Sequence, residues 1–464
     1  MRVIDSVLMV TVFVAAAWWA FARGRQPIAL GVLSLGALGL TVVTLLAEGL
    51  HWQLVPWQVL ATACAAATSL RWWRPGISRR WNRVLGRVGL LAGVTIGGLG
   101  LLFVSVPSLP RPTGQHLVGS QVFRWTDARR PETFTADPGD RREVVAQAWY
   151  PTDVTQGQRV PYFEAQDHLP TRIDVYPSWF FNDFRQVETH ATMSPALSDE
   201  RATWPVVLFS PGWGMSREDY TGLCADLASR GFVVVAMSHP FESAVTVLAS
   251  GQVVGQSGDA SIFGANMVDM SDIRAADSSF VLDQLTQFAR IEPTSPLAGH
   301  LDLQHVGMIG HSLGGATAVQ VMSTDARFQV GVNIDGVIPA SFASASLDRP
   351  FLWLQSDSKA DDHYVQVRDE LMGGLREGGD IIVVGGSVHQ SFTDTQSYFS
   401  ATGRGLMGDG ARPEAVDDVT WFTGDVIAAF VGPYLGGPAQ PSLDQVFVRH
   451  PSVREERHVA ARTS

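Results

Sequence analysis

One serine of the chain has the surroundings of an enzyme nucleophile. Ser312 lies between Gly310 and Gly314 in a G-x-S-x-G pattern, after the apolar run 306–310 and before a stretch of small residues. This context predicts a sharp strand-to-helix turn that lifts the serine hydroxyl above the edge of a sheet. We expect that only glycine fits at Gly310 and Gly314, where neighbouring chain must pass close. We also expect the following helix to direct its first N–H groups toward the serine.

A serine hydroxyl is a weak nucleophile, so a histidine base and an acid that orients this base must follow. In hydrolases with such a turn the chain order is serine, acid, histidine. Of the four histidines after Ser312, His389 lies in a loop that leaves the last apolar strand, where the base belongs. His363 begins a helix, and His450 and His458 lie near the C-terminus. The pattern therefore predicts His389 as the base.

Two aspartates are candidates for the acid. Asp335 follows the apolar run 330–334, and Asp357 follows the next run, 351–355, which is the commoner acid position in hydrolases of this kind. Spacing alone does not separate them, and either residue could instead cap a helix. The residues by themselves leave both aspartates as candidates.

Ester hydrolysis through an acyl-enzyme also needs two backbone N–H groups that stabilise the oxyanion. Leu313, directly after the nucleophile, supplies one by its position. The second is expected from Trp213 in the loop Pro211–Gly214, because the glycines of this loop let the backbone turn toward the site. His239 and Glu242 follow a predicted strand nearby and are expected to shape the pocket. This chemistry uses no cofactor and no metal ion.

The elements that must hold these residues alternate along the chain. Short apolar runs, apolar on both faces, are typical of parallel strands covered by helices on both sides; they span 144–150, 206–210, 232–237, 306–310, 330–334, 351–355 and 381–384. Amphipathic segments between them predict helices at 218–230, 275–290, 314–326 and 362–377. The alternation predicts the α/β class, with the doubly wound, mostly parallel sheet of the α/β-hydrolase fold.

The composition divides the chain into four parts. They are a membrane region, a linker with edge strands, the catalytic domain and a C-terminal tail, at 1–106, 107–143, 144–437 and 438–464. Within the catalytic domain, 162–204 lacks the alternation of strands and helices and is expected to be a cap insertion. Its aromatic residues 179–181 either pack against the core or meet lipid. The last residues, 451–464, are polar and are expected to be frayed.

The membrane region holds four apolar segments, each about long enough to cross a hydrocarbon core as a helix: 6–22, 28–47, 53–70 and 88–106. The loops after the first and third segments carry eight arginines, whereas the opposite side has only Arg2 and Arg111. Arginine-rich loops stay in the cytoplasm, so about four transmembrane helices place everything after residue 107 outside. We therefore expect a multi-pass cell-membrane protein with an extracytoplasmic catalytic domain. The first segment could instead be a signal peptide.

The distribution of charge argues against nucleic acid as a partner. The chain has a net charge of −11, yet its first 110 residues hold nine arginines and two acids, so the remainder is strongly acidic at about −18. An acidic domain lacks the basic surface that binds phosphate backbones. Cys64 and Cys224 lie in apolar stretches and are expected to be buried thiols rather than a disulfide. Nothing in the sequence indicates an oligomeric state.

Several stretches of the catalytic domain carry a family resemblance: 205–214, 227–236, 310–320, 325–335 and 386–390. Together, from about Trp149 to Phe399, they resemble the plasma-type (isoform II) platelet-activating-factor acetylhydrolases. The resemblance implies calcium-independent hydrolysis of short or oxidised sn-2 acyl chains of phospholipids through an acyl-enzyme. It also implies Asp335, 23 residues after Ser312, as the acid, and Trp213 and Leu313 as the oxyanion donors.

Two features depart from that family. Pro211 stands where the family usually has histidine, so the hydrogen bonding of this loop must differ. The membrane region is not part of the secreted members, so association with lipoproteins is not implied. The alternative enzyme is a short-chain carboxylesterase or a cutinase-like polyester hydrolase. A membrane-anchored binding module on an inactive hydrolase fold is a further alternative, which the complete catalytic set argues against.

Overall fold

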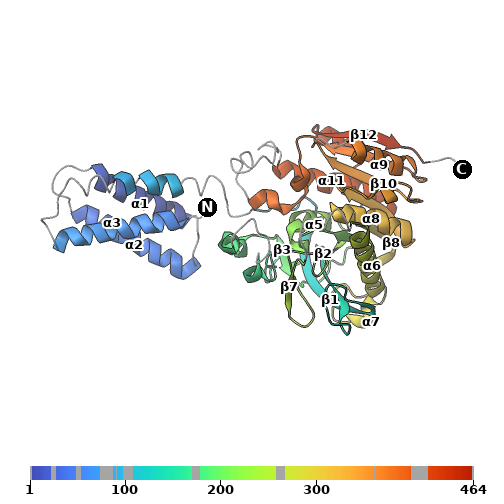
Figure 1. Ribbon diagram of the computed structural model, residues 1–464, viewed down its shortest axis with the longest axis horizontal. Helices are drawn as coiled ribbons and strands as arrows, with labels where there is room; N and C mark the ends of the chain where they lie inside the picture. Colours follow the sequence, from blue (N-terminus) through green and yellow to red (C-terminus); the bar gives the residue numbers. More distant parts are fainter. Residues whose placement is uncertain are drawn as a thin grey trace. The chain divides into compact units, whose positions relative to one another are not determined.

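The computed structural model describes residues 3–21, 28–48, 54–73, 87–89, 91–97, 108–169, 178–257, 267–358, 362–398 and 416–461. The chain forms two compact units, an N-terminal unit built mainly from residues 1–107 and an α/β unit built from most of the remainder. Figure 1 draws the helices of the first unit in blue and the sheet of the second from cyan to red. Each unit has an apolar core of its own.

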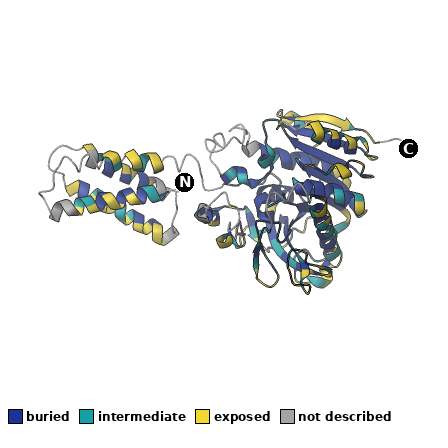
Figure 2. Ribbon diagram, in the orientation of Figure 1, coloured by how far each residue is buried: buried dark blue, intermediate teal, exposed yellow. Residues whose placement is uncertain are grey.

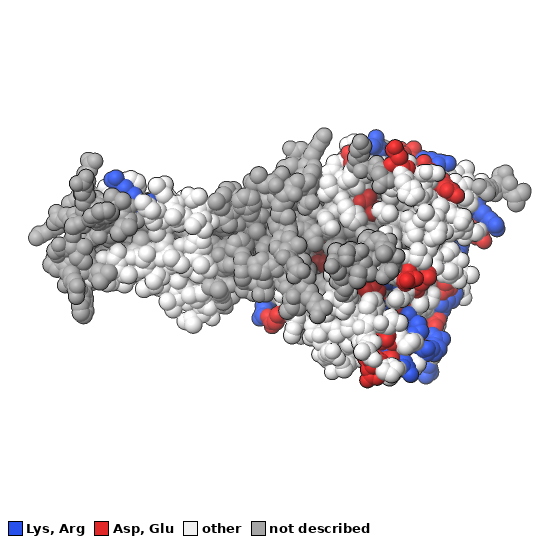
Figure 3. Space-filling model, viewed as in Figure 1, with Lys and Arg blue, Asp and Glu red and all other residues white. Residues whose placement is uncertain are grey.

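The N-terminal unit contains three apolar helices: α1 (Val3–Phe21), α2 (Ile28–Glu48) and α3 (Val55–Trp73). Their sequences are rich in alanine, leucine and valine, and they bury a small cluster that includes Leu8, Val12 and Leu60. Large apolar residues of these helices are also exposed, among them Ile28 at 78% and Leu46 at 84%. Figure 2 shows exposed positions along all three helices. In the view of Figure 3 the described atoms of these helices are almost all uncharged.

The expectation of about four transmembrane helices is not supported. Among the described residues a single helical segment, Ile28–Leu46, is long and apolar enough to cross a membrane, and it lies near the N-terminus, where a signal sequence would pass the same test. The apolar helices Val7–Trp18 and Arg87–Gly97 are shorter, and α3 mixes its apolar residues with polar ones such as Gln58. Most of the arginine-rich loop 71–87 and the end of the fourth segment lie outside the described residues.

The α/β unit is built on a ten-stranded sheet in the order β12-β11-β10-β9-β8-β4-β5-β2-β1-β3. From β11 to β5 all neighbouring strands are parallel, whereas β2 and β1 continue the sheet antiparallel. Each predicted apolar run coincides with a strand of this mostly parallel sheet, except that Phe232 lies just before β5. The strands are β1 (Leu117–Pro131), β2 (Arg141–Thr152), β3 (Ala191–Met193), β4 (Trp204–Ser210), β5 (Val233–Ser238), β8 (Leu301–His311), β9 (Phe328–Ile334), β10 (Phe351–Ser356), β11 (Gly379–Val384) and β12 (Val453–Val459).

Helices cover both faces of this sheet, as the α/β-hydrolase pattern requires (Figure 1). One face carries α6 (Met267–Thr286), α7 (Phe288–Ile291), α8 (Leu313–Thr324) and α9 (Asp362–Gly373). The other face carries α5 (Thr221–Ser229), α11 (Val416–Leu435) and α12 (Leu443–Arg449). The central strands are buried from end to end, which explains why their sequences are continuous apolar runs rather than alternating ones.

Shorter elements complete the unit. A small hairpin of β6 (Val245–Val247) and β7 (Val253–Gly255) lies outside the main sheet. The short 3-10 helices are η2 (Gln166–His168), η3 (Ser178–Gln186), η4 (Arg217–Tyr220), η6 (Ala340–Phe342), η7 (His389–Phe392) and η8 (Asp394–Tyr398). The stretch 162–204 that was expected to be a cap includes β3, which pairs with β1 at the edge of the main sheet. Residues 170–177 of this stretch lie outside the described residues.

Residues 453–459 form a strand, so the expectation of a frayed tail over 451–464 is wrong for this part of it, and 462–464 lie outside the described residues. The strand β12 pairs antiparallel with β11, from Val384 opposite Val453 to Gly379 opposite Val459. Its side chains are mostly exposed and charged, a pattern that resembles a solvated tail in sequence but is also how proteins protect an edge strand. Residues 438–464 therefore add a helix and a strand to the catalytic fold.

Candidate active site

The turn at Ser312 has the strained geometry of a nucleophile elbow. The strand β8 ends at His311, α8 begins at Leu313, and Ser312 between them has φ 56° and ψ −121°. A non-glycine residue in this region of backbone space costs about 1–3 kcal/mol, so the surrounding contacts must hold it. The Ser312 N–H donates to the carbonyl of Ile334, and its own carbonyl accepts from the N–H of Gly315. The hydroxyl is thereby presented at the carboxyl ends of β8 and β9.

The two glycines of the motif are required by close backbone approaches. A Cβ at Gly310 would lie 1.9 Å from the carbonyl oxygen of Gly314, and a Cβ at Gly314 would lie 1.9 Å from the carbonyl oxygen of Ser210. Both obstacles are main-chain atoms and cannot move independently of the sheet. The expectation that only glycine fits at these two positions is therefore confirmed. Gly314 also brings the elbow against the end of β4, where the loop Pro211–Gly214 begins.

We expect the Gly314→Ala variant to lose about 3 kcal/mol of folding stability, because the added methyl group forces β4 and α8 apart. For a domain of this size that loss lowers the midpoint of thermal unfolding by roughly 4 °C. Gly373→Ala is the control, since a Cβ there meets only the end of the Arg457 side chain at 3.8 Å. Equal midpoints for the two variants in thermal unfolding of the full chain would contradict the prediction.

Asp335 and His389 are brought together from two separate loops. The Nδ1–H of His389 donates to Oδ2 of Asp335 over 2.8 Å. The second carboxylate oxygen accepts from the N–H of Ser356, and the Asp335 N–H donates to the carbonyl of Leu354. Burial opposes ionisation of Asp335, but the bonds from His389 and Ser356 outweigh it and hold the pKa of this carboxyl below its usual range.

Asp357 and the other late histidines have different partners. The carboxylate of Asp357 accepts from the Gly386 N–H over 3.0 Å and is 44% exposed, so it supports the loop before His389 without contacting the imidazole. His450 bonds to Asp425, and His458 bonds to Asp380 at the edge of the sheet. Of the two candidate aspartates, the structure pairs Asp335 with His389.

The loop Pro211–Gly214 forms a tight turn beside the elbow. The N–H of Met215 donates to the carbonyl of Gly212 over 3.2 Å, and Gly214 in this turn has φ 73°, a conformation that favours glycine. A Cβ at Gly212 would lie 3.3 Å from the Cβ of Ser312, so the turn lies against the serine. Leu313 is the first residue of α8, where N–H groups have no partner within the helix.

Comparison with known proteins identifies the relatives of this chain. The family model of platelet-activating factor acetylhydrolase, isoform II, matches residues 107–287 and 287–404, which is more than half of the sequence. The chain belongs to this family. The matched region covers Ser312, Asp335 and His389 and leaves out the N-terminal helices.

Curated relatives of this family member are distant in sequence. A probable 1-alkyl-2-acetylglycerophosphocholine esterase of Arthroderma benhamiae is 31% identical over 133 residues, which cover 28% of this chain and 31% of the fungal one. The platelet-activating factor acetylhydrolase of Cavia porcellus is 29% identical over 239 residues, 46% of this chain and 52% of that protein. The chain thus spans about half or less of these relatives.

A solved structure matches the fold of this family member over a longer stretch. The ferulic acid esterase of Streptomyces cinnamoneus superposes with a TM-score of 0.62 at 25% identity. The match covers 76% of this chain and all of the esterase chain. It supports the α/β-hydrolase fold that the sequence predicts.

His311, the residue before the serine, links the two loops of this acetylhydrolase-family site. Its Nε2–H donates to the carbonyl oxygen of His389 over 3.0 Å, and its Nδ1 accepts from the hydroxyl of Tyr220 over 2.8 Å. The same Tyr220 oxygen accepts from the Gly212 N–H over 2.9 Å. Burial, together with the nearby His389, lowers the pKa of His311 to about 3, so the imidazole stays neutral and keeps this pattern of donor and acceptor.

The low pKa of His311 predicts acid sensitivity of the fold. Above pH 6.5 the imidazole is neutral in both states; between pH 6.5 and about 3 only the unfolded chain takes up the proton, so stability falls as pH falls. One such proton corresponds to about 1.4 kcal/mol per pH unit. We expect His311→Gln to flatten the fall in unfolding midpoint between pH 6.5 and 4, whereas His305→Gln, at an exposed histidine, leaves it unchanged. Identical slopes for all three proteins would contradict this prediction.

Sequence reasoning missed several residues that hold the site. Tyr220 and His311 were not singled out, and neither were Arg274 and Asp277 on α6, which are fully buried behind the loop Pro211–Gly214. A histidine next to the nucleophile is a local signal that could have been followed. The charged residues of α6 give no such signal, because their partners lie on distant strands. Cys64 and Cys224 are free and buried, as expected.

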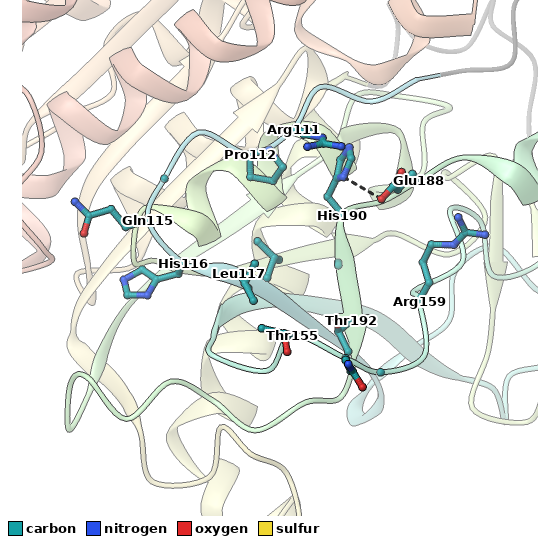
Figure 4. Close-up of a pocket in the computed structure, with 15 residues that line it drawn as sticks. Arg111, Pro112, Gln115, His116, Leu117, Thr155, Arg159, Glu188, His190 and Thr192 are labelled. Carbon is teal, nitrogen blue, oxygen red and sulfur yellow. Dashed lines mark ion pairs between the residues drawn. The ribbon is translucent and has the colours of Figure 1, made fainter. Parts of the chain in front are cut away.

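A separate cavity of about 710 Å³ lies beside the β1–β3 edge of the sheet (Figure 4). Its polar lining includes the ion pair between Nδ1 of His190 and Oε1 of Glu188, 3.6 Å apart. Arg111 and Arg159 also line it. None of the residues expected to act in catalysis is part of this lining, so the cavity is distinct from the elbow.

Proposed function

We propose that the chain is a serine esterase that hydrolyses short or oxidised sn-2 acyl esters of phospholipids through an acyl-enzyme. The observation that carries the proposal is the Asp335–His389 pair beside a strained elbow at Ser312. Membership of the acetylhydrolase family supports this substrate class, and so does the fungal relative named as a probable 1-alkyl-2-acetylglycerophosphocholine esterase.

The proposed reaction proceeds in two balanced halves. The Ser312 oxygen attacks the ester carbonyl while its proton moves to Nε2 of His389, and Asp335 stabilises the imidazolium through Nδ1–H. The oxyanion accepts hydrogen bonds from the backbone N–H groups of Leu313 and Trp213. The C–O bond to the leaving alcohol breaks, and His389 returns the proton to that alcohol. Water then attacks the acyl-enzyme by the same steps and releases the acid.

The experiment that tests this proposal uses the purified full chain in detergent. Hydrolysis is measured on a phospholipid panel with sn-2 chains from acetyl to palmitoyl and on an aryl acetate. We expect turnover of the sn-2 acetyl phospholipid to exceed that of the palmitoyl one by at least about 100-fold, as the proposed preference for short sn-2 chains requires. Equal turnover of all chain lengths would overturn the proposed specificity.

A second candidate is a short-chain carboxylesterase or a cutinase-like polyester hydrolase. The observation that favours it is the match to a ferulic acid esterase, which extends over all of that chain. Hydrolysis of the aryl acetate with no release of acetate from any phospholipid would support this candidate. The Ser312→Ala variant serves as the blank for both substrates.

We also propose that the N-terminal helices attach the enzyme to the cell membrane, with the α/β unit on the extracytoplasmic side. The exposed apolar side chains of α2 and the arginines of the adjoining loops support it. A reporter that is active only outside the cytoplasm, fused after residue 461, is expected to be active. Activity only of a cytoplasmic reporter at the same place would overturn the orientation. The reporter is placed after residue 461 because a fusion after residue 450 would remove β12.

A further inference from the structure

A buried ion pair lies directly behind the loop Pro211–Gly214. Arg274 on α6 and Glu242 after β5 are 0% and 1% exposed, and Nε of Arg274 donates to Oε2 of Glu242 over 2.8 Å. The Nη1–H of Arg274 also donates to the carbonyl oxygen of Pro211 over 2.6 Å. The N–H of Gly214 donates to the backbone carbonyl of Glu242 over 3.1 Å. The Arg274 guanidinium therefore holds the loop at Pro211, and the main chain of Glu242 holds it at Gly214.

These contacts fix the direction of the peptide group between Gly212 and Trp213. The Gly212 carbonyl accepts from the Met215 N–H, and a trans peptide directs the Trp213 N–H to the opposite side. The peptide before it is held at its carbonyl by Arg274, as above, and at its N–H by Tyr220. The peptide after it is held by Glu242. Rotation of the Trp213 N–H would require breaking a neighbouring contact.

A second series of buried side-chain contacts fixes the strand that leads into the loop. Oγ of Ser210, the last residue of β4, lies 3.0 Å from Nε2 of His239, whose Nδ1 lies 2.8 Å from Oδ2 of Asp277. The Arg142 guanidinium donates to the same carboxylate over 2.7 Å. Ser210, His239 and Asp277 are completely buried, so this serine is not accessible to a substrate. The serine, histidine and aspartate are linked in the same order as in a catalytic triad, but here they hold the end of β4 in place.

We propose that Arg274 and Glu242 are positioning residues that aim the Trp213 N–H at the oxyanion, an inference that rests on the proposed esterase function. Burial of a charged pair contributes little net stability, because desolvation offsets the attraction. The pair instead fixes positions, since the one guanidinium of Arg274 contacts both the Pro211 carbonyl and the side chain of Glu242. In this way the chain holds the loop at the position where the family usually has histidine.

The test compares Arg274→Gln with Arg368→Gln, a matched variant of another buried arginine. Arg368 is 2% exposed and pairs with Glu456 of β12, at the opposite end of the sheet from β1. We expect both variants to lower the unfolding midpoint, but only Arg274→Gln to lower kcat, by about 10–100-fold with KM unchanged, as partial loss of an oxyanion donor predicts. Amide hydrogen exchange in residues 211–215 should accelerate only in Arg274→Gln.

Arg274→Lys keeps the experiment informative if the glutamine variant does not fold. Lysine retains the charge against Glu242 but cannot donate to Glu242 and Pro211 with a planar fork. We expect a near-normal unfolding midpoint with a reduced kcat. Unchanged exchange at 211–215 in the folded Arg274 variants would overturn the proposal, even in a protein inactive on every ester. Absence of esterase activity in the unmodified chain would overturn the proposed function instead, so the two failures are distinguishable.

Discussion

Ser312→Ala is expected to lower kcat for any ester by about 10⁵–10⁶-fold, because the residual rate then comes from binding and the oxyanion donors alone. The variant removes a single oxygen from a partly exposed side chain and should keep the unfolding midpoint of the original chain. Labelling by a fluorophosphonate probe, which reports a covalent bond to an activated serine, should disappear with the activity. Both measurements use the full chain in detergent.

The matched control for this experiment is Ser210→Ala. Ser210 also has a histidine and an aspartate behind it, but its hydroxyl is completely buried. We expect the Ser210→Ala variant to be labelled to completion, although more slowly if the strand end shifts. Labelling that survives in Ser312→Ala and disappears in Ser210→Ala would show that the wrong serine has been assigned.

The second large effect is expected at Asp335. In Asp335→Asn the amide can donate to Nδ1 of His389, which stabilises the tautomer with its proton on Nε2 and prevents that nitrogen from accepting the serine proton. We expect a loss of about 10⁴-fold in kcat. Asp357→Asn should stay within about tenfold of the original, since Asp357 contacts the backbone of Gly386 and not the imidazole.

The pH dependence of the original chain and the relative losses in the two aspartate variants both check this pairing. In the original chain the low pKa of Asp335 keeps the carboxylate ionised throughout the working range, so protonation of Asp335 should not limit kcat/KM on the acid side. A loss of equal size in both variants, or a larger loss in Asp357→Asn, would contradict the pairing with Asp335.

The central strands could be predicted from the sequence because burial on both faces leaves few polar positions in them. The runs at β4, β5, β9 and β10 are such strands, and their alternation with helices fixed the fold class. The last strand could not be predicted in this way. In β12 the charged side chains face solvent, and only the hydrogen bonds to β11 make it a strand.

Ser312 and His389 were predictable because each lies at a local signal, a glycine-flanked turn or a loop after a buried strand. Asp335 and Asp357 follow adjacent strands and differ only in which carboxylate reaches the His389 imidazole. The number of residues between them along the chain does not give that distance. Of the residues behind the loop, His239 and Glu242 could be singled out because they follow a predicted strand, whereas Arg274 and Asp277 could not. Arg274 contacts Pro211, 63 positions away in the chain, and only the folded sheet brings them together.

The membrane region also shows how far local sequence signals can be used for prediction. Length and apolar composition are local properties, and α2 satisfies them. The inference of about four transmembrane helices also used α3, whose polar residues weaken the signal, and segment 88–106, which the structure describes only in part. Loop charge indicates an orientation only once the number of crossings is known.

The position of β12 has a consequence for the order of events during synthesis. The ribosome completes β11 before α11 and α12 and reaches β12 after every other strand of the sheet. Until then the edge of β11, with Ile381 to Val384 in its apolar sequence, has no partner and can pair with another nascent chain. Folding of the nascent chain is therefore completed by its least apolar strand, and a chain that ends before Val453 would leave the edge of β11 open on an otherwise complete sheet.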